Sequence, residues 1–201
     1  MKPLICLLII SIKCGMSVSY NNRVIALDTE TTGFNRKRNG DVERGHRIIE
    51  IGAVEMVGGV LTGREFHAYV NPGMKIDRDA TKVHGISDDF LRGRGGFEEI
   101  FPEFFSFISE GDPLIVIHNA HFDISFLDQE FDSLPDHLKS RLHDVKFRYV
   151  DSLELSREMF PSQKNTLDAV ADRIGLKRVG AHSALGDAQI LAMVFLKIFS
   201  H

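Results

Sequence analysis

Cysteine is almost absent from this 201-residue sequence. Its two cysteines are Cys6 and Cys14, so the chain from Gly15 onward has none. A disulfide framework or a thiolate zinc site is therefore excluded over that part of the chain. This cysteine usage fits a protein that works in a reducing cytoplasm.

The sequence also lacks the long apolar run that a membrane-spanning helix needs, which is about 20 residues. The run from Leu4 to Ile12 has only nine. It follows Lys2, and three interpretations stay open: an over-extended start or dispensable leader, a signal peptide without a clear cleavage site, or a packed element. We expect residues 1–22 to be an N-terminal extension and residues 23–201 to form one domain.

Positive charge is not in excess, because 24 Lys and Arg residues stand against 28 Asp and Glu residues, a net charge of −4. The protein as a whole does not attract nucleic acid, so a polyanionic partner would need local basic patches or bound cations. The loop with Arg36, Lys37, Arg38, Arg44 and Arg47 could contact phosphates, although such runs are more often solvated loops.

Apolar patterning predicts strands that alternate with helices. Strands are expected at Val24–Thr29, Arg47–Val57, about Leu61–Asn71, "PLIVIH" and Tyr149–Asp151, with Gly58-Gly59 as a hairpin turn. Helices are expected at "FEEIFPEFFSFI", Phe122–Leu134, Ser152–Met159, Thr166–Ile174 and about Leu185–Phe199. Hairpin strands come first and strand–helix alternation follows, so we predict an α/β fold with a mixed sheet flanked by helices on both faces.

Two carboxylates stand at the end of the first strand, in the segment "IALDTETTG". Asp28 and Glu30 are two residues apart, so both point to the same face of that strand, where they repel each other. Two further acids, Asp123 and Asp187, stand at the heads of the apolar stripes of two predicted helices. Acids are common near helix N-termini because the helix dipole favours them, but this does not explain why they face inward.

Four inward carboxylates without an obvious Lys or Arg partner would be very costly to bury. Divalent cations would remove that cost, and an all-oxygen site suits Mg²⁺ or Mn²⁺. Two such ions are the common apparatus for cleaving phosphodiesters. We therefore predict that Asp28, Glu30, Asp123 and Asp187 bind two divalent cations.

A histidine, His182, precedes Asp187 by five residues in "AHSALGDA". Five residues are about 140° around a helix, so we place His182 in the loop before the helix, from which it reaches back over the site. A neutral imidazole there could take a proton from a metal-bound water. The alternative is a surface histidine in a loop.

Three motifs, "DTETTG", "HNAHFDISFL" and "HSALGD", occur here in the order and type found in the DEDDh exonucleases. With "IIEIGAV" and "VHGI", the chain resembles the DnaQ-like members of that family, which include the proofreading subunits of bacterial DNA polymerase III. The resemblance covers about residues 23–199. It implies an RNase H-like fold and a metal-dependent 3′→5′ exodeoxyribonuclease that removes mispaired 3′ nucleotides.

The resemblance also implies roles for single residues. Asp28 would bridge both metals, Glu30 and Asp187 would complete the site of the water-activating metal, Asp123 would support the second metal, and His182 would be the general base. The backbone at Thr31 and Thr32 would receive the terminal nucleotide. His84, His118 and Asn119 resemble residues that line the substrate cleft, although a structural hydrogen-bonding role stays open for them.

DNA 3′ ends, single-stranded or frayed, are the partner that the resemblance implies, with no membrane. The polymerase III catalytic subunit is a further possible partner. Relatives that join a replicase usually carry a tail beyond the catalytic domain, whereas this sequence stops at His201. Two alternatives remain: an RNA-trimming relative on the same scaffold, and a catalytically inactive nuclease fold that serves as a binding module.

Glu50, an acid within an apolar strand, is expected to form a structural ion pair or to face solvent.

Overall fold

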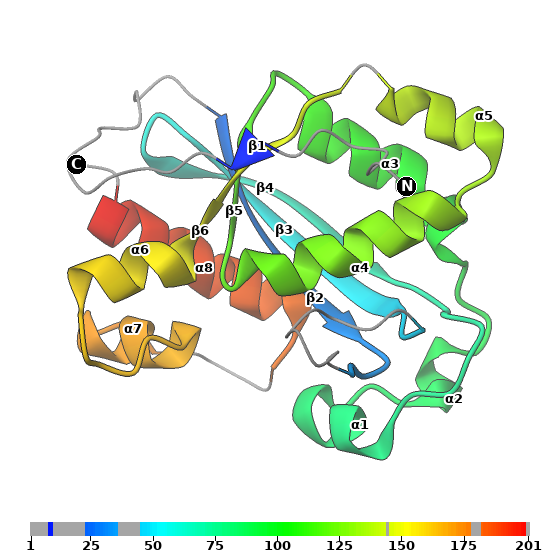
Figure 1. Cartoon of the computed structure of the whole chain (residues 1–201), viewed down its shortest axis with the longest axis horizontal. Coiled ribbons are helices and arrows are strands. Elements are labelled where there is room, and N and C mark those ends of the chain that lie inside the picture. Colours follow the sequence, from blue (N-terminus) through cyan, green and yellow to red (C-terminus); the bar gives the residue numbers. More distant parts are fainter. Residues whose placement is uncertain (1–7, 10–22, 36–44, 144, 178–181, 200–201) are drawn as a thin grey trace.

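A six-stranded mixed sheet forms the centre of the molecule (Figure 1). The structure, a computed structural model, describes residues 8–9, 23–35, 45–143, 145–177 and 182–199. The strands are β1 (Leu8–Ile9), β2 (Arg23–Thr31), β3 (Ile48–Val57), β4 (Val60–Tyr69), β5 (Leu114–Ile117) and β6 (Arg148–Asp151). Their order is β1-β6-β5-β2-β3-β4; β2, β3 and β4 are antiparallel neighbours, and the other pairs are parallel. The predicted mixed sheet is confirmed.

The predicted hairpin turn and the predicted central strand are both present. Gly58 and Gly59 have φ of 61° and 76°, the left-handed pair that a tight two-residue hairpin requires. All four residues of β5 are buried, as expected for a short apolar strand between two parallel neighbours.

Helices cover both faces of the sheet, as predicted. They are α1 (Arg78–His84), α2 (Asp88–Leu91), α3 (Phe97–Ser109), α4 (Ala120–Ser133), α5 (Asp136–Lys139), α6 (Ser152–Met159), α7 (Leu167–Arg173) and α8 (Ala184–Phe199), with a 3₁₀ turn at Ser140–Leu142. In Figure 1, α3 and α4 lie on one side of the sheet and α6, α7 and α8 on the other. None of the helices in the described ranges is long and apolar enough to cross a membrane.

Three short helices, α1, α2 and α5, were not predicted, because four to seven residues are too few to show a helical apolar period. The strand expected to reach Asn71 ends at Tyr69. In the N-terminal extension, Leu8 and Ile9 pair with Arg148 and Tyr149 at the sheet edge. The rest of that extension, and Arg36, Lys37, Arg38 and Arg44 of the basic loop, lie outside the described residues.

Alternate residues of β2 enter two separate cores. Ile25 and Leu27 pack in the core that includes the phenylalanines of α3 and α4. Val24 and Ala26 pack in the core that includes α7 and α8. Because side chains alternate along a strand, Asp28 and Glu30 continue the face toward α8. This alternation decides which helix can bring further groups to the two acids.

Candidate active site

Three of the four predicted acids meet at one point. One carboxylate oxygen from each of Asp28, Glu30 and Asp187 lies within 4.8 Å of the others. Asp28 and Glu30 come from the end of β2, and Asp187 comes from the first turn of α8. Carboxylates at such separations repel unless cations are shared between them, and an all-oxygen set is the donor chemistry that Mg²⁺ or Mn²⁺ prefers. The donor set thus fits a divalent metal.

The close approach of α8 to the sheet depends on Gly52. This glycine lies opposite Asp28 in the β2–β3 pair. A Cβ atom at Gly52 would be 2.2 Å from the Leu185 nitrogen and 2.3 Å from the Ala184 carbonyl carbon. The start of α8 therefore rests directly on the backbone of β3, and this contact brings Asp187 next to the two acids of β2. A glycine inside a strand indicates a close backbone approach, so Gly52 was the one signal in the sequence for this contact, and it was not among the predicted site residues.

Asp123 is the fourth acid, and it is not part of this three-residue cluster. It is buried on α4, where its Oδ1 accepts hydrogen bonds from the Thr29 backbone N–H at 3.0 Å and the Thr29 hydroxyl at 2.7 Å. Burial raises the pKa of the Asp123 carboxyl to about 7, against the lowering effect of the Thr29 hydrogen bonds. Its contacts tie the start of α4 to the end of β2.

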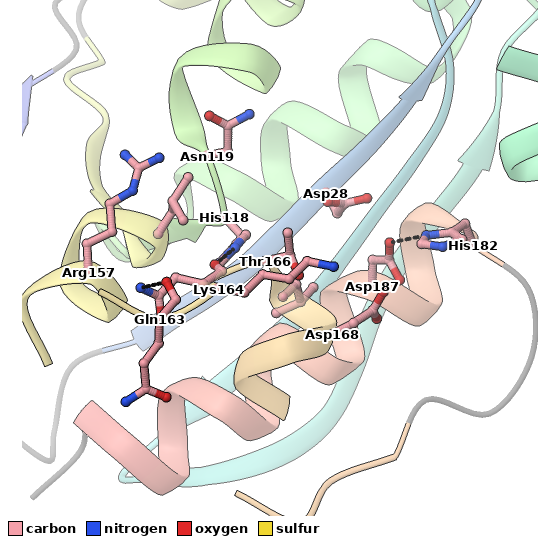
Figure 2. A pocket seen from close by; sticks show the side chains of 13 residues that line it. Asp28, His118, Asn119, Arg157, Gln163, Lys164, Thr166, Asp168, His182 and Asp187 are labelled. Atoms are coloured by element: carbon pink, nitrogen blue, oxygen red, sulfur yellow. Dashed lines mark hydrogen bonds and ion pairs between the residues drawn. The ribbon is translucent and has the colours of Figure 1, made fainter. Parts of the chain in front are cut away.

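His182 lies at the cluster, as predicted. Its Nδ1 is 3.6 Å from Asp187 Oδ2, and its side chain is 47% exposed (Figure 2). It precedes α8, which begins at Ala184, so the imidazole reaches the site from the preceding loop. An exposed imidazole beside the acids can exchange protons with solvent, which a proton acceptor in hydrolysis must do.

Thr31 and Thr32, whose backbone was predicted to receive the terminal nucleotide, and His84, which was predicted to line the substrate cleft, are all buried. The Thr32 backbone N–H donates to the Arg47 carbonyl, and the Thr32 carbonyl accepts from the Asp77 N–H, so this backbone is already engaged. His84 Nδ1 accepts from the Ile86 N–H at 3.0 Å, so the neutral ring carries its proton on Nε2. Within the described ranges, that buried Nε2 makes no hydrogen bond of good geometry; burial lowers the pKa of the ring, against the raising effect of the Thr31 backbone.

His118 and Asn119 line a pocket beside the acids. Both ring nitrogens of His118 already contact the protein, Nδ1 with the Ser152 hydroxyl at 2.9 Å and Nε2 with the Asn165 carbonyl at 3.0 Å. Burial lowers the pKa of His118, so the ring is neutral. Its geometry thus matches the structural alternative left open above. The Asn119 backbone, with φ of 67°, donates to Asp151 and starts α4.

Glu50 is in contact with His67, and this contact is an ion pair whenever the imidazole is protonated, one of the two roles expected for Glu50. It is buried next to Glu30 in the β2–β3 register, and its Oε1 is 2.8 Å from His67 Nε2. Glu50 therefore has a partner on β4 and is not one of the three clustered acids.

The sequence profile of the family described as "Exonuclease" (RNase_T) matches residues 25–195. The chain is 41% identical over 182 residues to "DNA polymerase III subunit epsilon" of Buchnera aphidicola, covering 89% of this chain and 75% of that protein. It is 46% identical over 176 residues to the protein of the same name from Escherichia coli, covering 87% and 70%.

The fold is shared with solved exonuclease structures. One is the nuclease domain of 3'hExo, "a DEDDh family member, bound to rAMP", with a TM-score of 0.68, 17% identity, and coverage of 89% of this chain and 92% of that one. The RNase H-like exonuclease fold expected from the motifs is therefore present.

Proposed function

The chain belongs to the DEDDh exonuclease family, with DNA polymerase III epsilon subunits among its relatives, and from this premise we propose a mechanism for its proofreading 3′→5′ exonuclease activity. We propose that Asp28, Glu30 and Asp187 hold divalent cations, with Asp123 in support, and that the enzyme hydrolyses the last phosphodiester of a DNA 3′ end. The observation that carries this is the meeting of three carboxylates within 4.8 Å, with His182 beside Asp187.

DEDDh exonucleases depend on divalent metal, and we propose two Mg²⁺ or Mn²⁺ ions for this chain. When bound, such ions would stabilise charge on the phosphate and make water a better nucleophile. The proton transfer is assigned to side chains of the protein. His182 accepts the proton of the attacking water, because its ring is exposed and lies 3.6 Å from Asp187. Asp187, with Oδ2 3.6 Å from Nδ1 of His182, orients that ring.

The terminal nucleotide would lie on the side of Thr31, Thr32 and His84. His84 offers a buried Nε2–H donor there, and the exposed Phe34 packs edge-on against Phe122 with ring centroids 5.5 Å apart. A base that enters this side would be separated from its complement. Separating a paired end costs stacking energy of about 1.4 kcal/mol per base-pair step. A mismatched end needs less unpairing energy, so we expect it to be cut faster than a matched end.

The test is hydrolysis of a labelled primer–template with a matched or mismatched 3′ end, in Mg²⁺ or in EDTA. We expect loss of single nucleotides from the 3′ end, faster on the mismatch, and none in EDTA. Asp28→Asn should abolish turnover, whereas Asp136→Asn, an exposed acid on α5, should not. Equal rates on matched and mismatched ends, or full activity in EDTA, would refute the proposal. A labelled RNA strand separates DNA from RNA preference.

The relatives are named as subunits of DNA polymerase III, so we propose that this chain also works beside a polymerase catalytic subunit, in the cytoplasm. Co-purification of the two chains, followed by a stimulated excision rate on a mismatched primer, is the expected result. Failure of the two to associate at micromolar concentration would leave it a free-standing nuclease.

A further inference from the structure

A pocket of about 670 Å³ extends from the acid cluster to the loop between α6 and α7 (Figure 2). Asp28, Asp187 and His182 are among its lining residues, as are Arg157 and Lys164. In Figure 2 the first three lie on one side of the pocket, Arg157 lies on the other, and Lys164 lies between them. The pocket therefore joins the proposed reaction centre to two cationic side chains that the mechanism above does not use.

The pocket is lined by residues other than those proposed for the terminal nucleotide. Neither Thr31, Thr32 nor His84 is among its lining residues. An enzyme that cuts one nucleotide from a strand must hold that nucleotide on one side of the reaction centre and the remaining strand on the other. The pocket is thus the available place for the remaining strand, whose phosphates carry one negative charge per nucleotide.

The two cationic side chains can accept such a charge. Lys164 and Arg157 are exposed, and in the part of the chain that the structure describes neither makes a salt bridge. In Figure 2 the Lys164 side chain extends along the pocket in the direction of Asp28 and Asp187. Asp168, an acid on the same rim, is engaged in an interaction of its own. In a protein of net charge −4, this is a local basic site beside an acidic one.

The loop that presents Lys164 is held rigidly. Asn165 is 7% exposed, and its side chain donates to the carbonyls of Phe160 and Gln163, both at 3.1 Å. Arg173 donates to the Asn165 side chain at 3.3 Å and to the Lys164 carbonyl at 2.9 Å. These contacts fix the direction in which the Lys164 side chain leaves the backbone, so little loop entropy is lost when a ligand binds.

His118 ties this loop to the reaction centre. Its Nε2–H donates to the Asn165 carbonyl at 3.0 Å, and its Nδ1 accepts from the Ser152 hydroxyl at 2.9 Å. His118 directly follows β5, one of the strands next to β2, whose end carries Asp28 and Glu30. The ring thus sets the position of Lys164 relative to the acids without contacting substrate through a nitrogen.

We propose that Lys164, with Arg157 beyond it, binds the phosphates of the strand on the 5′ side of the scissile phosphodiester, and that His118 is the positioning residue for this clamp. The proposal rests on the proposed exonuclease function and deepens it, because it assigns the groups that hold the strand that remains. Charge-assisted contacts from an exposed lysine to one phosphate are worth about tenfold in kcat/KM.

The test compares two substrates. One is a single-stranded oligonucleotide, and the other is the p-nitrophenyl ester of a nucleoside 5′-monophosphate, which has the reacting phosphodiester but no strand on its 5′ side. Lys164→Ala should lower the ratio of kcat/KM for the oligonucleotide to kcat/KM for the ester about tenfold. Lys164→Arg should restore it. Lys146→Ala, an exposed lysine before the start of β6, is the matched control and should keep the wild-type ratio.

A second measurement identifies the phosphate. An oligonucleotide with a neutral methylphosphonate next to the scissile phosphate on its 5′ side should be a poorer substrate for the wild type. The methylphosphonate should lower kcat/KM by a smaller factor in Lys164→Ala, because this variant no longer has the lysine that contacts the charged phosphate. The negative slope of log(kcat/KM) against log[salt] should also become shallower by about 0.7 in this variant, because one phosphate contact is lost.

The outcomes separate the two proposals. If the wild type cuts neither substrate, the exonuclease function itself fails. If the wild type cuts both but Lys164→Ala lowers both equally, or keeps the full methylphosphonate effect, the clamp is refuted while the nuclease stands. For His118→Ala, a ratio that falls as in Lys164→Ala supports the positioning role, and an unchanged ratio overturns it.

Discussion

Adding one methyl group at Gly52 should damage the active site without touching any acid. The Cβ atom of Gly52→Ala would lie 2.2 Å from the Leu185 nitrogen and 2.3 Å from Leu185 Cα, whereas ordinary contact begins at 3.4 Å. Both neighbours are backbone atoms of the first turn of α8, so no side chain can rotate away. The start of the helix must move by roughly 1 Å, and Asp187 moves with it.

The size of the effect follows from this displacement. A shift of about 1 Å in a catalytic constellation can cost about 10²-fold in rate. Overpacking of this kind also destabilises a protein by about 1–3 kcal/mol. For a chain of this size, that lowers Tm by about 2–12 °C, which leaves the protein folded at 25 °C. Half-maximal activity should need more Mg²⁺, because Asp187 is one of the three clustered acids.

The assay is kcat/KM on a single-stranded oligonucleotide as a function of Mg²⁺ concentration, with Tm measured on the same preparation. Gly96→Ala is the matched control, because its φ is −75° and a Cβ there meets nothing within 4 Å. It should keep the wild-type rate and metal dependence. If Gly52→Ala also keeps both, the contact between β3 and α8 does not set the position of Asp187, and the reasoning is wrong.

Three further predictions concern the metals, the base and the buried acid. Mg²⁺ or Mn²⁺ should restore activity after EDTA, whereas Ca²⁺ should bind but support little turnover because its coordination is looser, and turnover in Ca²⁺ equal to that in Mg²⁺ would contradict this. His182→Ala should lower kcat about 10²–10⁴-fold at saturating Mg²⁺. Its Tm should change little, since the side chain is 47% exposed. Full rescue of the rate by added metal would instead show that His182 only helps to assemble the metal site. Burial raises the pKa of Asp123 from 3.8 to about 7. Between these two pH values, Asp123 is protonated in the folded metal-free protein but ionised in the unfolded chain. The Tm of the wild type should therefore fall relative to that of Asp123→Asn as pH rises from about 4 to about 7, and a pH-independent difference would show that Asp123 ionises normally.

Much of the fold could be predicted because its signals are local. Ser152–Met159 is a helix as predicted, and the Gly58-Gly59 turn lies where the pattern placed it. The all-apolar segment of β5 is central in the sheet for the reason given, since both its faces are covered by helices. The short helices α1, α2 and α5 were missed because they carry no period.

The candidate site was predicted in composition but not in arrangement. Spacing along β2 was enough to place Asp28 and Glu30 on one face, and helical spacing was enough to turn Asp187 inward. Nothing local distinguished Asp187 from Asp123. The structure separates them, because α8 and α4 pack on opposite faces of the sheet, and only Asp187 is in the cluster with the acids of β2.

By itself the sequence determined the residue types and their alternation, since strand and helix periods depend only on neighbours along the chain. It therefore determined the acids, the histidine and the mixed sheet. Tertiary packing alone decided the contacts between segments distant in sequence. These include Gly52 beneath the start of α8, His118 bonded to Asn165 across 47 residues, and the reach of Lys164 toward the acids. Such contacts depend on how two surfaces fit, and a single linear pattern does not encode that fit.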